Sequence, residues 1–460
     1  MTDAAPRLAA LAETLLGGPL PVRIRAWDGS ESGPAAGPVL VLNNRRALRH
    51  MLWKPGELGL ARAWVAGDLA VDGDLFDLLD KVAGLVWERE HAAAPVPVRR
   101  PRSGLAKLAA LRPHLPARAS GAAGTAALLR DPATRAAVRE LVALSRPWTR
   151  PAPPPEEAVR QGGIIHSRSR DRHAISHHYD VGNEFYELVL GPSMVYSCAY
   201  WTEAGSLEDA QRDKLDLVCR KLALKPGQRL LDVGCGWGSM ALHAAREYGV
   251  RVTGITLSTE QAAFARKRIA EEGLTDRIEI RVQDYRDVKD GPYDAISSIG
   301  MAEHVGSERY RAYAGILHGL LAPGGRLLNH QIGRPPEPDE AAYEIDEFID
   351  AYVFPDGELS PVGSTVGELE KAGFEVRDVE ALREHYALTL RAWVTRLEEH
   401  WDEAVRLTSP GRARVWLLYM AASALGFEHA RLGVNQILAV KPGGGGRSGM
   451  PLRARVWGGA

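Results

Sequence analysis

The residues Leu230-Leu231-Asp232-Val233-Gly234-Cys235-Gly236-Trp237-Gly238 decide the fold of this chain. A short apolar run leads into three glycines at alternate positions, and Met240-Ala241-Leu242-His243-Ala244-Ala245 follows with the composition of a helix. Glycines lack the Cβ atom that would keep a ligand off the backbone, and they permit a tight turn between a strand and a helix. The stretch therefore predicts a strand, a nucleotide-binding turn and a helix.

The spacing of the glycines excludes two kinds of nucleotide site. No Gly-Lys-Ser/Thr is present, so the turn is not a phosphate loop of the ATPase type. Ser239-Met240-Ala241 follows Gly238, so the dinucleotide pattern G-x-G-x-x-G is absent as well. The pattern D-x-G-x-G-x-G instead resembles motif I of class I S-adenosylmethionine-dependent methyltransferases. A dehydrogenase or a plain tight turn is the alternative at this point.

The segments that follow the glycines support a Rossmann-like sheet. Residues 251–257, 278–287 and 292–299 each contain a short apolar run, and helical stretches separate the runs. No Asp or Glu ends the first of these runs, where a dinucleotide-binding fold places its ribose ligand. Strands that alternate with helices predict an α/β fold with a doubly wound, parallel sheet, whose ligand lies at the carboxyl ends of the strands.

The composition indicates an ordinary globular protein. The 460 residues are 45% hydrophobic and 25% charged, and the formal net charge of -1 gives no support to a nucleic-acid-binding role. The three cysteines, Cys198, Cys219 and Cys235, have no metal-binding spacing, so we expect no metal and a reducing compartment. No apolar run of about 18 residues occurs, and the N-terminus lacks the pattern of a signal peptide. We therefore expect a cytoplasmic location.

Shifts in composition along the chain predict four parts. Residues 1–91 contain strand and helix patterns, which favours a small N-terminal α+β domain. Residues 92–160 are rich in Ala, Pro and Arg and are predicted to be a linker. The methyltransferase domain is expected over 161–442, and a flexible tail over 443–460. The linker arginines Arg99, Arg100 and Arg102 would suit anionic lipid headgroups, although a solvated linker has the same composition.

Four further segments carry a more specific pattern, namely HHYDVGNEFY at 177–186, MVYSCAYW at 194–201, GMAEHVG at 300–306 and NHQIG at 329–333. In this order they resemble the cyclopropane-fatty-acyl-phospholipid synthase family, which includes mycolic acid cyclopropane synthases and the actinobacterial enzymes that make 10-methyl fatty acids. The resemblance extends from about His177 to Lys441. Residues 53–68 also resemble the extra N-terminal domain of the long, phospholipid-acting members.

The resemblance implies a base site and a cofactor site. The base would be a bicarbonate ion held by the side chains of Cys198, Glu303, His330 and Tyr386 and by the backbone amide of Ile332. A buried small residue, a helix start and a core histidine are the structural alternatives for Cys198, Glu303 and His330. The resemblance also places S-adenosylmethionine. Its methionine end would contact Tyr179, Tyr196 and Ser197, and Gly234 and Gly236 would lie along it. Its ribose would contact Thr256, Leu257 and Gln261, and its adenine would contact Gln283, Asp284 and Tyr285.

The implied reaction adds a one-carbon unit to the double bond of an unsaturated acyl chain of a membrane phospholipid. Ala302 stands beside Glu303 where the family commonly has Phe, which changes the space next to the base. After methyl transfer, proton loss closes a cyclopropane ring or, with a hydride shift, leaves an exocyclic methylene. We expect the 10-methylene product, a precursor of 10-methyl chains, and keep the cyclopropane product as the alternative.

Two other function classes stay open on the sequence. One is a small-molecule methyltransferase, because a fold does not fix a function. The other is a lipid-binding protein with a relic cofactor site. For the preferred function we expect peripheral binding to an anionic membrane surface on the inner face of the cell membrane. We also expect a flavin-dependent reductase as a partner and a homo-oligomer.

Overall fold

The computed structural model describes residues 3–16, 18–92, 132–158, 167–168, 170, 181–202, 205–338, 340, 343 and 345–452. The chain divides into two compact units, and each is described by itself. Unit 1 comprises Met1–Val159, Glu337–Val353 and Ser409–Ala422. Unit 2 comprises Arg160–Pro336, Phe354–Thr408 and Ser423–Ala460.

Unit 2 contains a seven-stranded sheet in the order β10-β11-β9-β8-β5-β6-β7. The parallel part consists of β5 (Arg229–Val233), β6 (Arg251–Thr256), β7 (Ile278–Val282), β8 (Tyr293–Ile299) and β9 (Leu321–Gly333). Two antiparallel strands, β10 (Glu375–Ala381) and β11 (Gly433–Val440), complete it beyond β9. The predicted doubly wound sheet is confirmed, and the antiparallel edge was not predicted.

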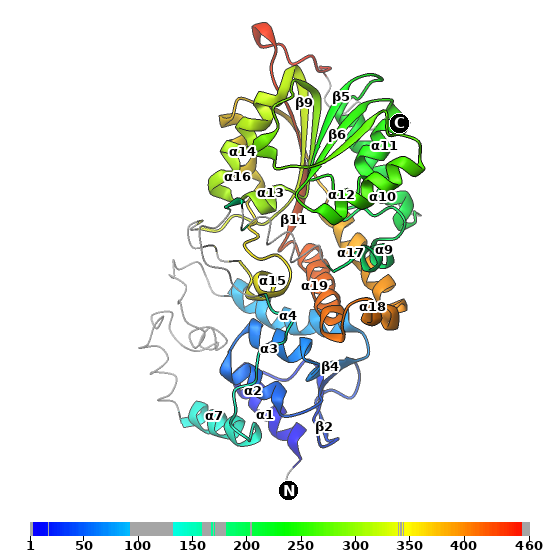
Figure 1. Cartoon of the computed structure of the whole chain (residues 1–460). Helices are drawn as coiled ribbons and strands as arrows, with labels where there is room; N and C mark the ends of the chain where they lie inside the picture. The colour runs from blue at the N-terminus through cyan, green and yellow to red at the C-terminus, as the bar shows by residue number, and fades with distance from the viewer. Residues whose placement is uncertain are drawn as a thin grey trace. The chain divides into compact units, whose positions relative to one another are not determined.

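Helices cover both faces of this sheet, as Figure 1 shows. One core layer is built from α10 (Leu207–Leu222), α11 (Ser239–Tyr248) and α12 (Thr259–Glu271), and the other from α14 (Ser307–Leu320) and α16 (Val362–Lys371). Leu230 belongs to the first layer and its neighbour Leu231 to the second, because successive side chains of a strand point to opposite faces. The apolar run before the glycines is thus buried on both sides.

The connections place a switch point at β5. The chain passes from β5 to β6 and β7 on one side and then returns to β8 on the other side. In open α/β sheets the crevice at such a reversal, outside the carboxyl ends of the strands, is the usual ligand site. Further helices in the described residues from 181 onward are α9 (Asn183–Leu190), α13 (Ala302–Val305), α15 (Glu347–Tyr352), α17 (Arg383–Glu399), α18 (Trp401–Leu407) and α19 (Pro410–Glu428).

Unit 1 contains the predicted small α+β arrangement. Its four-stranded sheet has the order β2-β1-β3-β4 and consists of β1 (Arg23–Arg25), β2 (Glu31–Ser32), β3 (Val39–Leu42) and β4 (Leu69–Asp72). Its N-terminal helices are α1 (Ala4–Leu16), α2 (Arg46–Trp53), α3 (Glu57–Val65) and α4 (Leu75–Ala92). The buried Asp68 carboxylate accepts hydrogen bonds from Asn44 and Arg46, which ties the start of α2 to the turn before β4.

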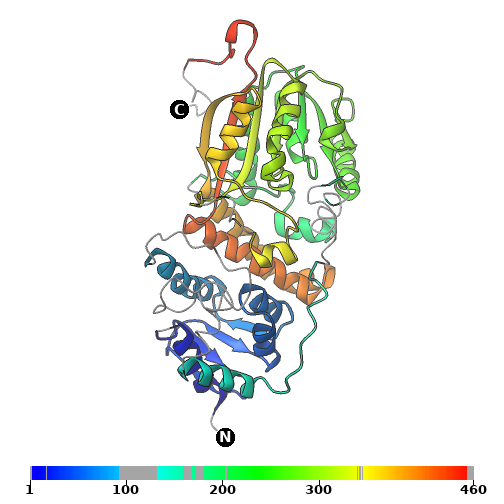
Figure 2. The same cartoon turned by 90° about the vertical axis from the view of Figure 1, so that its left-hand side faces the viewer.

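The boundaries differ from the prediction at several places. Glu337–Val353 and Ser409–Ala422 were predicted within the methyltransferase domain, but they belong to unit 1. Residues 132–158 were predicted as linker, but α7 (Pro132–Leu144) packs beside α1 and contributes Leu144 to the core of unit 1 (Figure 2). Residues 443–452 were predicted as flexible tail, but they contain the 3-10 helix η3 (Gly444–Gly446), and Met450 packs against the core of unit 2. Arg99, Arg100 and Arg102 lie outside the described residues. No helix in the described part of the chain has the length and apolar composition needed to cross a bilayer.

Candidate active site

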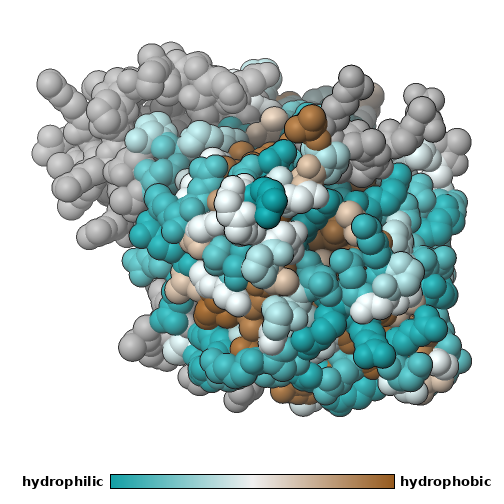
Figure 3. All heavy atoms as spheres, turned by 90° about the horizontal axis from the view of Figure 1, so that it is seen from above, coloured by the Kyte–Doolittle hydropathy of each residue, from teal (hydrophilic) through white to brown (hydrophobic). Residues whose placement is uncertain are grey.

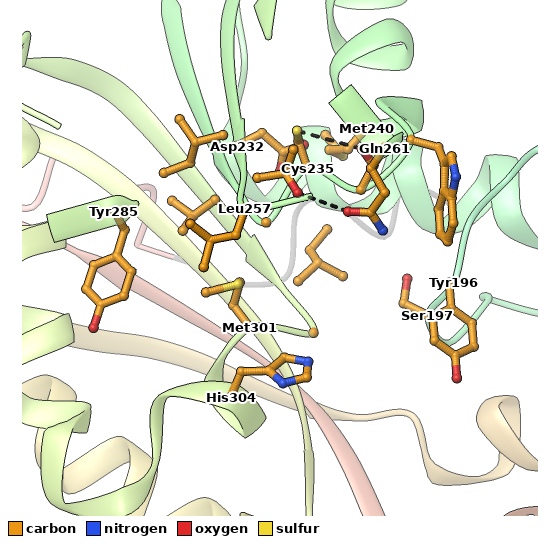
Figure 4. A pocket seen from close by; sticks show the side chains of 18 of the residues that line it. Tyr196, Ser197, Asp232, Cys235, Met240, Leu257, Gln261, Tyr285, Met301 and His304 are labelled. Carbon is orange, nitrogen blue, oxygen red and sulfur yellow. Dashed lines mark hydrogen bonds between the residues drawn. The ribbon is translucent and has the colours of Figure 1, made fainter. Parts of the chain in front are cut away.

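A pocket lies at the carboxyl ends of β5, β6, β7 and β8, where the topology predicts a ligand. Ten of the eleven predicted cofactor residues line it, namely Tyr196, Ser197, Gly234, Gly236, Thr256, Leu257, Gln261, Gln283, Asp284 and Tyr285. The eleventh, Tyr179, lies outside the described residues. In Figure 4 Tyr285 lies on one side of the pocket and Tyr196 and Ser197 on the other, with Leu257 and Met301 between them. The predicted adenine and methionine ends therefore face each other across one pocket.

The glycine turn has a backbone that only glycine adopts readily. Gly234, Gly236 and Gly238 have φ angles of +76°, +52° and +83°. The N–H groups of Gly234 and Cys235 both donate to the Ile255 carbonyl, at 2.9 and 3.0 Å, and fix the turn to β6. A Cβ atom at Gly236 would meet no protein atom within 4 Å, because the residue borders the pocket. The turn thus leaves room for a ligand along its backbone.

Local hydrogen bonds fix the residues predicted at the ribose. The Thr256 hydroxyl donates to the Gln261 side-chain oxygen at 2.9 Å and accepts from the Ser258 N–H at 3.2 Å. Ser258 in turn caps α12 by accepting from the Gln261 N–H. These bonds orient the Gln261 amide at the rim of the pocket, a position suited to a sugar hydroxyl.

The adenine end holds an ion pair that the sequence analysis missed. Both oxygens of Asp284 accept from the Arg286 guanidinium, at 2.8 and 2.6 Å, and Arg286 also lines the pocket. Burial acts to raise the pKa of Asp284, but the bonds from Arg286 outweigh it and lower that pKa below its ordinary value. Tyr285 packs edge-on against Tyr313 with ring centroids 4.8 Å apart. The carboxylate is therefore held in place before any ligand binds.

Two charged residues at the other end were not predicted as site residues. Lys214 of α10 and Asp232 of β5 are buried and line the pocket. The Lys214 ammonium donates to the Ser197 hydroxyl at 2.9 Å, and one Asp232 oxygen accepts from Ser297 at 2.7 Å. A lysine in a polar helix usually lies on a solvated face, so the sequence carried no signal for Lys214. Asp232 is the acid of the glycine motif itself.

None of the five residues predicted to hold the base lines this pocket, but two of them, Cys198 and Glu303, lie within segments that do. Ser197 lines the pocket, and Cys198 follows it in the chain. Met301 and His304 line it, and Glu303 lies between them on α13. The base site and the cofactor pocket therefore share these two segments.

Hydrogen bonds and one strand pairing connect four of the five predicted base residues through Leu382. The Cys198 thiol donates to the Leu382 carbonyl at 3.6 Å, and the Tyr386 N–H donates to the same oxygen at 3.1 Å. The Leu382 N–H donates to Val434, which pairs with Ile332 across β11 and β9. Ile332 in turn donates to Glu303, at 2.7 Å. The structure thus brings together segments that are far apart in the sequence.

Glu303 carries a buried carboxyl group with one engaged oxygen. Its Oε1 accepts from the Ile332 N–H, and its buried Oε2 has no partner among the described residues. Burial raises the pKa of Glu303 to about 7, although the Ile332 N–H works in the opposite direction. The Ile332 amide, which the resemblance assigns to the ion, binds this carboxylate in the structure.

The other members of the set are neutral groups. Burial, followed by the charges of Lys214 and Lys221, lowers the pKa of His330 well below its ordinary value. The Gln436 amide nitrogen lies 3.3 Å from His330 Nδ1, so Nδ1 accepts and Nε2 carries the proton. This Nε2 is buried without a partner among the described residues. Burial raises the pKa of the Cys198 thiol, and the Tyr386 ring packs against Phe427 at 4.8 Å between centroids.

The residues present fit the two groups that the resemblance implies. The open glycine turn and the opposite charges at one end suit a nucleoside that carries an amino-acid group. An ion with both a hydroxyl and acceptor oxygens, as bicarbonate has, would satisfy the lone acceptor on Glu303 and the lone donor on His330. Among the described residues no cluster of His, Cys, Asp and Glu could hold a metal ion.

Comparison with known proteins shows the family of this chain. The sequence profile described as mycolic acid cyclopropane synthetase matches residues 166–437. The probable fatty acid methyltransferase Rv3720 of Mycobacterium tuberculosis is 42% identical over 94% of this chain and 94% of its own length. The cyclopropane-fatty-acyl-phospholipid synthase of Escherichia coli K12 is 40% identical over 55% of this chain and 63% of its own.

A solved structure is also similar to this chain. The mycolic acid cyclopropane synthase CmaA1 complexed with SAH and CTAB is 33% identical, with a TM-score of 0.55, over 58% of this chain and 97% of that chain. The matches and the pocket lead to one conclusion: this chain is an S-adenosylmethionine-dependent methyltransferase of the mycolic acid cyclopropane synthetase family.

Proposed function

We propose that this enzyme transfers a methyl group from S-adenosylmethionine to the double bond of an unsaturated acyl chain of a membrane phospholipid and forms a 10-methylene chain. The observation that carries the proposal is the buried set of Cys198, Glu303, His330 and Tyr386 directly beside the cofactor pocket. A methyltransferase for an oxygen or nitrogen acceptor needs no such set. The names of the relatives, a fatty acid methyltransferase and a fatty-acyl-phospholipid synthase, support an acyl substrate.

The chemistry explains why a buried base site is needed. An isolated alkene is a weak nucleophile, so the methyl group must come from an activated donor such as the sulfonium of S-adenosylmethionine. When the alkene carbon takes the methyl group, the C–S bond breaks, the thioether leaves with its electron pair and the chain carries a positive charge. Neutral and anionic groups in a water-excluded site stabilise such a charge strongly. One proton must then leave the chain.

We propose that a bicarbonate ion takes this proton, held by Glu303, His330, Cys198 and Tyr386. Glu303 acting alone is the alternative, because a raised pKa suits a general base, but its bond to Ile332 engages one of its two oxygens. The unpartnered Oε2 of Glu303 would accept from the ion's hydroxyl and the His330 Nε2–H would donate to its oxygen. The assignment of this ion rests on that complementarity and on the family resemblance.

The product follows from which proton is lost. Ala302 is buried next to Glu303 and leaves more space than the phenylalanine that is common in the family. We propose that this space favours a hydride shift and an exocyclic methylene, which a flavin-dependent reductase would convert to a methyl branch. A cyclopropane ring is the second candidate, because one relative is named for that product.

The test is to incubate purified protein with S-adenosylmethionine and oleoyl phosphatidylglycerol vesicles and to analyse the released fatty acid by mass spectrometry. A gain of one CH2 unit that ozonolysis cleaves at a terminal methylene supports the proposal. A gain of one CH2 unit that resists ozonolysis identifies the cyclopropane synthase. No gain with phospholipids, together with methylation of a free or carrier-bound acyl chain, would overturn the phospholipid assignment.

A further inference from the structure

A row of polar side chains crosses the sheet of unit 2 and ends at His330. Glu380 of β10 pairs with Gln436 of β11, and Gln436 pairs with His330 of β9. Residues that pair directly across neighbouring strands have their side chains on the same face of the sheet. Gln436 and His330 are buried, and the Glu380 side chain is 21% exposed. The row therefore leads from the edge strand inward to a residue of the predicted base set.

Lys221 joins this row from α10, which packs against β9. Its side chain is fully buried, and its ammonium is paired with the Glu380 carboxylate. The same ammonium donates to the Gln436 side-chain oxygen at 2.7 Å. At the other end of that amide, the Gln436 nitrogen lies 3.3 Å from His330 Nδ1. The polar contacts thus run without a break from Glu380 through Lys221 and Gln436 to His330.

The chemistry of these groups gives the chain of contacts one direction. An ammonium group has donors only, so it must meet the oxygen of the Gln436 amide, and the amide NH2 must then face His330. An NH2 group cannot accept, so His330 Nδ1 accepts. Burial, followed by the charges of Lys214 and Lys221, lowers the pKa of His330, so the ring is neutral and has a single N–H. The proton is therefore on Nε2, which is buried with no partner among the described residues.

Stability alone does not account for such a chain of contacts. Replacing a buried ion pair with apolar side chains of similar size is often neutral or stabilising. Leu328 and Leu438 lie two residues from His330 and Gln436 along the same strands, and both belong to an apolar core that the fold could have extended. A polar chain with one direction supplies what an apolar core cannot, because it decides which ring nitrogen carries the proton.

We propose that Gln436 and Lys221 are positioning residues that hold the His330 proton on Nε2, so that the ring donates to the base ion, while Glu380 balances the Lys221 charge. The opposite tautomer would present an acceptor where an oxygen of the ion needs a donor. Partners of this kind, one step behind a ligand-binding histidine, commonly fix its tautomer and orientation. The inference rests on the proposed function, because it deepens the role that His330 has there.

The tautomer is measured by nitrogen NMR on the full chain with isotope-labelled histidine, since protonated and bare ring nitrogens have well-separated shifts. The His330 signals are identified by their loss in the His330→Asn variant. The parent protein should show a single tautomer with the proton on Nε2, and added bicarbonate should shift the Nε2 signal. A proton on Nδ1, or a His330 ring that does not respond to bicarbonate, would overturn the inference.

Variants of Gln436 and Lys221 test the direction of the chain. Gln436→Glu places a carboxylate against Nδ1, so the proton should move to Nδ1. The bicarbonate concentration for half-maximal turnover should rise by about tenfold or more, with the affinity for S-adenosylhomocysteine unchanged. Lys221→Met removes the donor that fixes the amide, so both tautomers are expected. Lys221→Arg, which also only donates, should keep the proton on Nε2.

Gln331→Met is the matched control. Gln331 is a buried glutamine of β9 whose amide contacts Asn329 and Thr365, on the opposite face of the sheet from His330. This variant should leave the His330 tautomer and its response to bicarbonate unchanged. If Gln436→Glu lowers turnover while the proton stays on Nε2, or moves the proton without changing the use of bicarbonate, the positioning role is wrong.

Failure of this inference and failure of the proposed function are distinguishable, because the tautomer and the bicarbonate shift are read without any acyl substrate. A parent protein that shows both signals but methylates no acyl chain contradicts the proposed function alone. A parent protein that methylates an acyl chain with His330 protonated on Nδ1 contradicts this inference alone.

Discussion

At the scale of single residues, the site contains buried polar atoms that lack a hydrogen-bond partner in the described part of the chain. Glu303 Oε2, His330 Nε2 and Asp232 Oδ2 are buried without partners among the described residues. Such groups cost stability in a folded protein unless a ligand satisfies them. Glu303 and His330 belong to the predicted base set and Asp232 lines the pocket, so a bound ligand is the natural partner for these three atoms.

Replacing Glu303 with glutamine is expected to separate catalysis from binding. The glutamine keeps the shape and can still accept from Ile332, but it removes the negative charge beside the ion. Turnover should fall by about 10²-fold or more, with little change in the affinity for S-adenosylhomocysteine. Steady-state kinetics and calorimetry on the same preparation measure the two effects. Equal losses in both would show that Glu303 is structural.

The raised pKa of Glu303 also predicts a pH-dependent difference in stability. The folded-state value of about 7 lies above the ordinary value of 4.5, so the stability from the protonated carboxyl is present at low pH and is lost as the pH rises through 7. The Glu303→Gln variant has no such group. Its free energy of unfolding relative to the parent should therefore increase by up to about 3 kcal/mol between pH 5 and pH 8. Urea unfolding of both proteins measures this, and parallel pH profiles would contradict it.

At the scale of secondary-structure elements, the sequence predicted what local chemistry determines. The apolar run, the alternate glycines and the helix after them gave the β5 turn and α11, because strand burial and positive φ angles leave clear signals. The family resemblance placed the cofactor residues in one pocket. No local pattern reported that Ile332 would bind Glu303 or that Lys214 would face the pocket. Those facts depend on how distant strands and helices pack.

The same limit explains the errors in the domain boundaries. Residues 132–144 are rich in alanine and arginine, so their composition resembled a linker, yet α7 packs on α1 and forms an ion pair between Arg7 and Glu140. The antiparallel strands β10 and β11 were likewise not predicted, because β10 is mostly charged and the short apolar run of β11 fits a strand or a buried helix equally well.

The glycine turn makes its own prediction. A valine at Gly236 would place a branched side chain in the space along the backbone and would strain a φ angle of +52°. Gly236→Val should abolish cofactor binding detectable by calorimetry while the protein stays folded. The matched control is Gly273→Ala, a second glycine with positive φ (+68°) and no neighbour within 4 Å, which does not line the pocket and should keep its affinity. If Gly236→Val keeps its affinity for the cofactor, the cofactor does not bind along this turn.

At the scale of the whole molecule, the proposed phospholipid substrate leads us to expect that the enzyme meets it at a membrane. Each buried CH2 group is worth about 0.8 kcal/mol, so bringing an acyl chain into water costs on the order of ten kcal/mol. For this contact we propose Trp53 and Trp148 of unit 1, which are exposed and pack together with ring centroids 5.3 Å apart. Exposed Arg146 and Arg150 flank Trp148 in the chain. On the face seen in Figure 3 hydrophilic residues predominate and hydrophobic ones form separate patches.

We therefore expect peripheral binding to anionic vesicles. The protein should sediment with them far better than with zwitterionic vesicles, and high salt should weaken the binding. Replacing Arg99, Arg100 and Arg102 with serine, or Trp53 and Trp148 with serine, should reduce vesicle binding and activity on vesicles while sparing cofactor affinity. Val82→Ser, at another exposed apolar residue of unit 1, is the control and should bind as the parent does. Unchanged sedimentation of both altered proteins would show that these arginines and tryptophans do not contribute to membrane binding.

The most direct test of the central claim follows the fate of the methyl hydrogens. The enzyme is incubated with S-adenosylmethionine that carries a CD3 group and with oleoyl phospholipid, and the fatty acid is analysed by mass spectrometry. Methyl transfer to an alkene followed by loss of one methyl proton leaves a CD2 unit on the acyl chain, both for the methylene product and for the ring. The account predicts this gain of CD2. An acyl chain without added mass, or a CD3 group found on a headgroup or another polar acceptor, would contradict it.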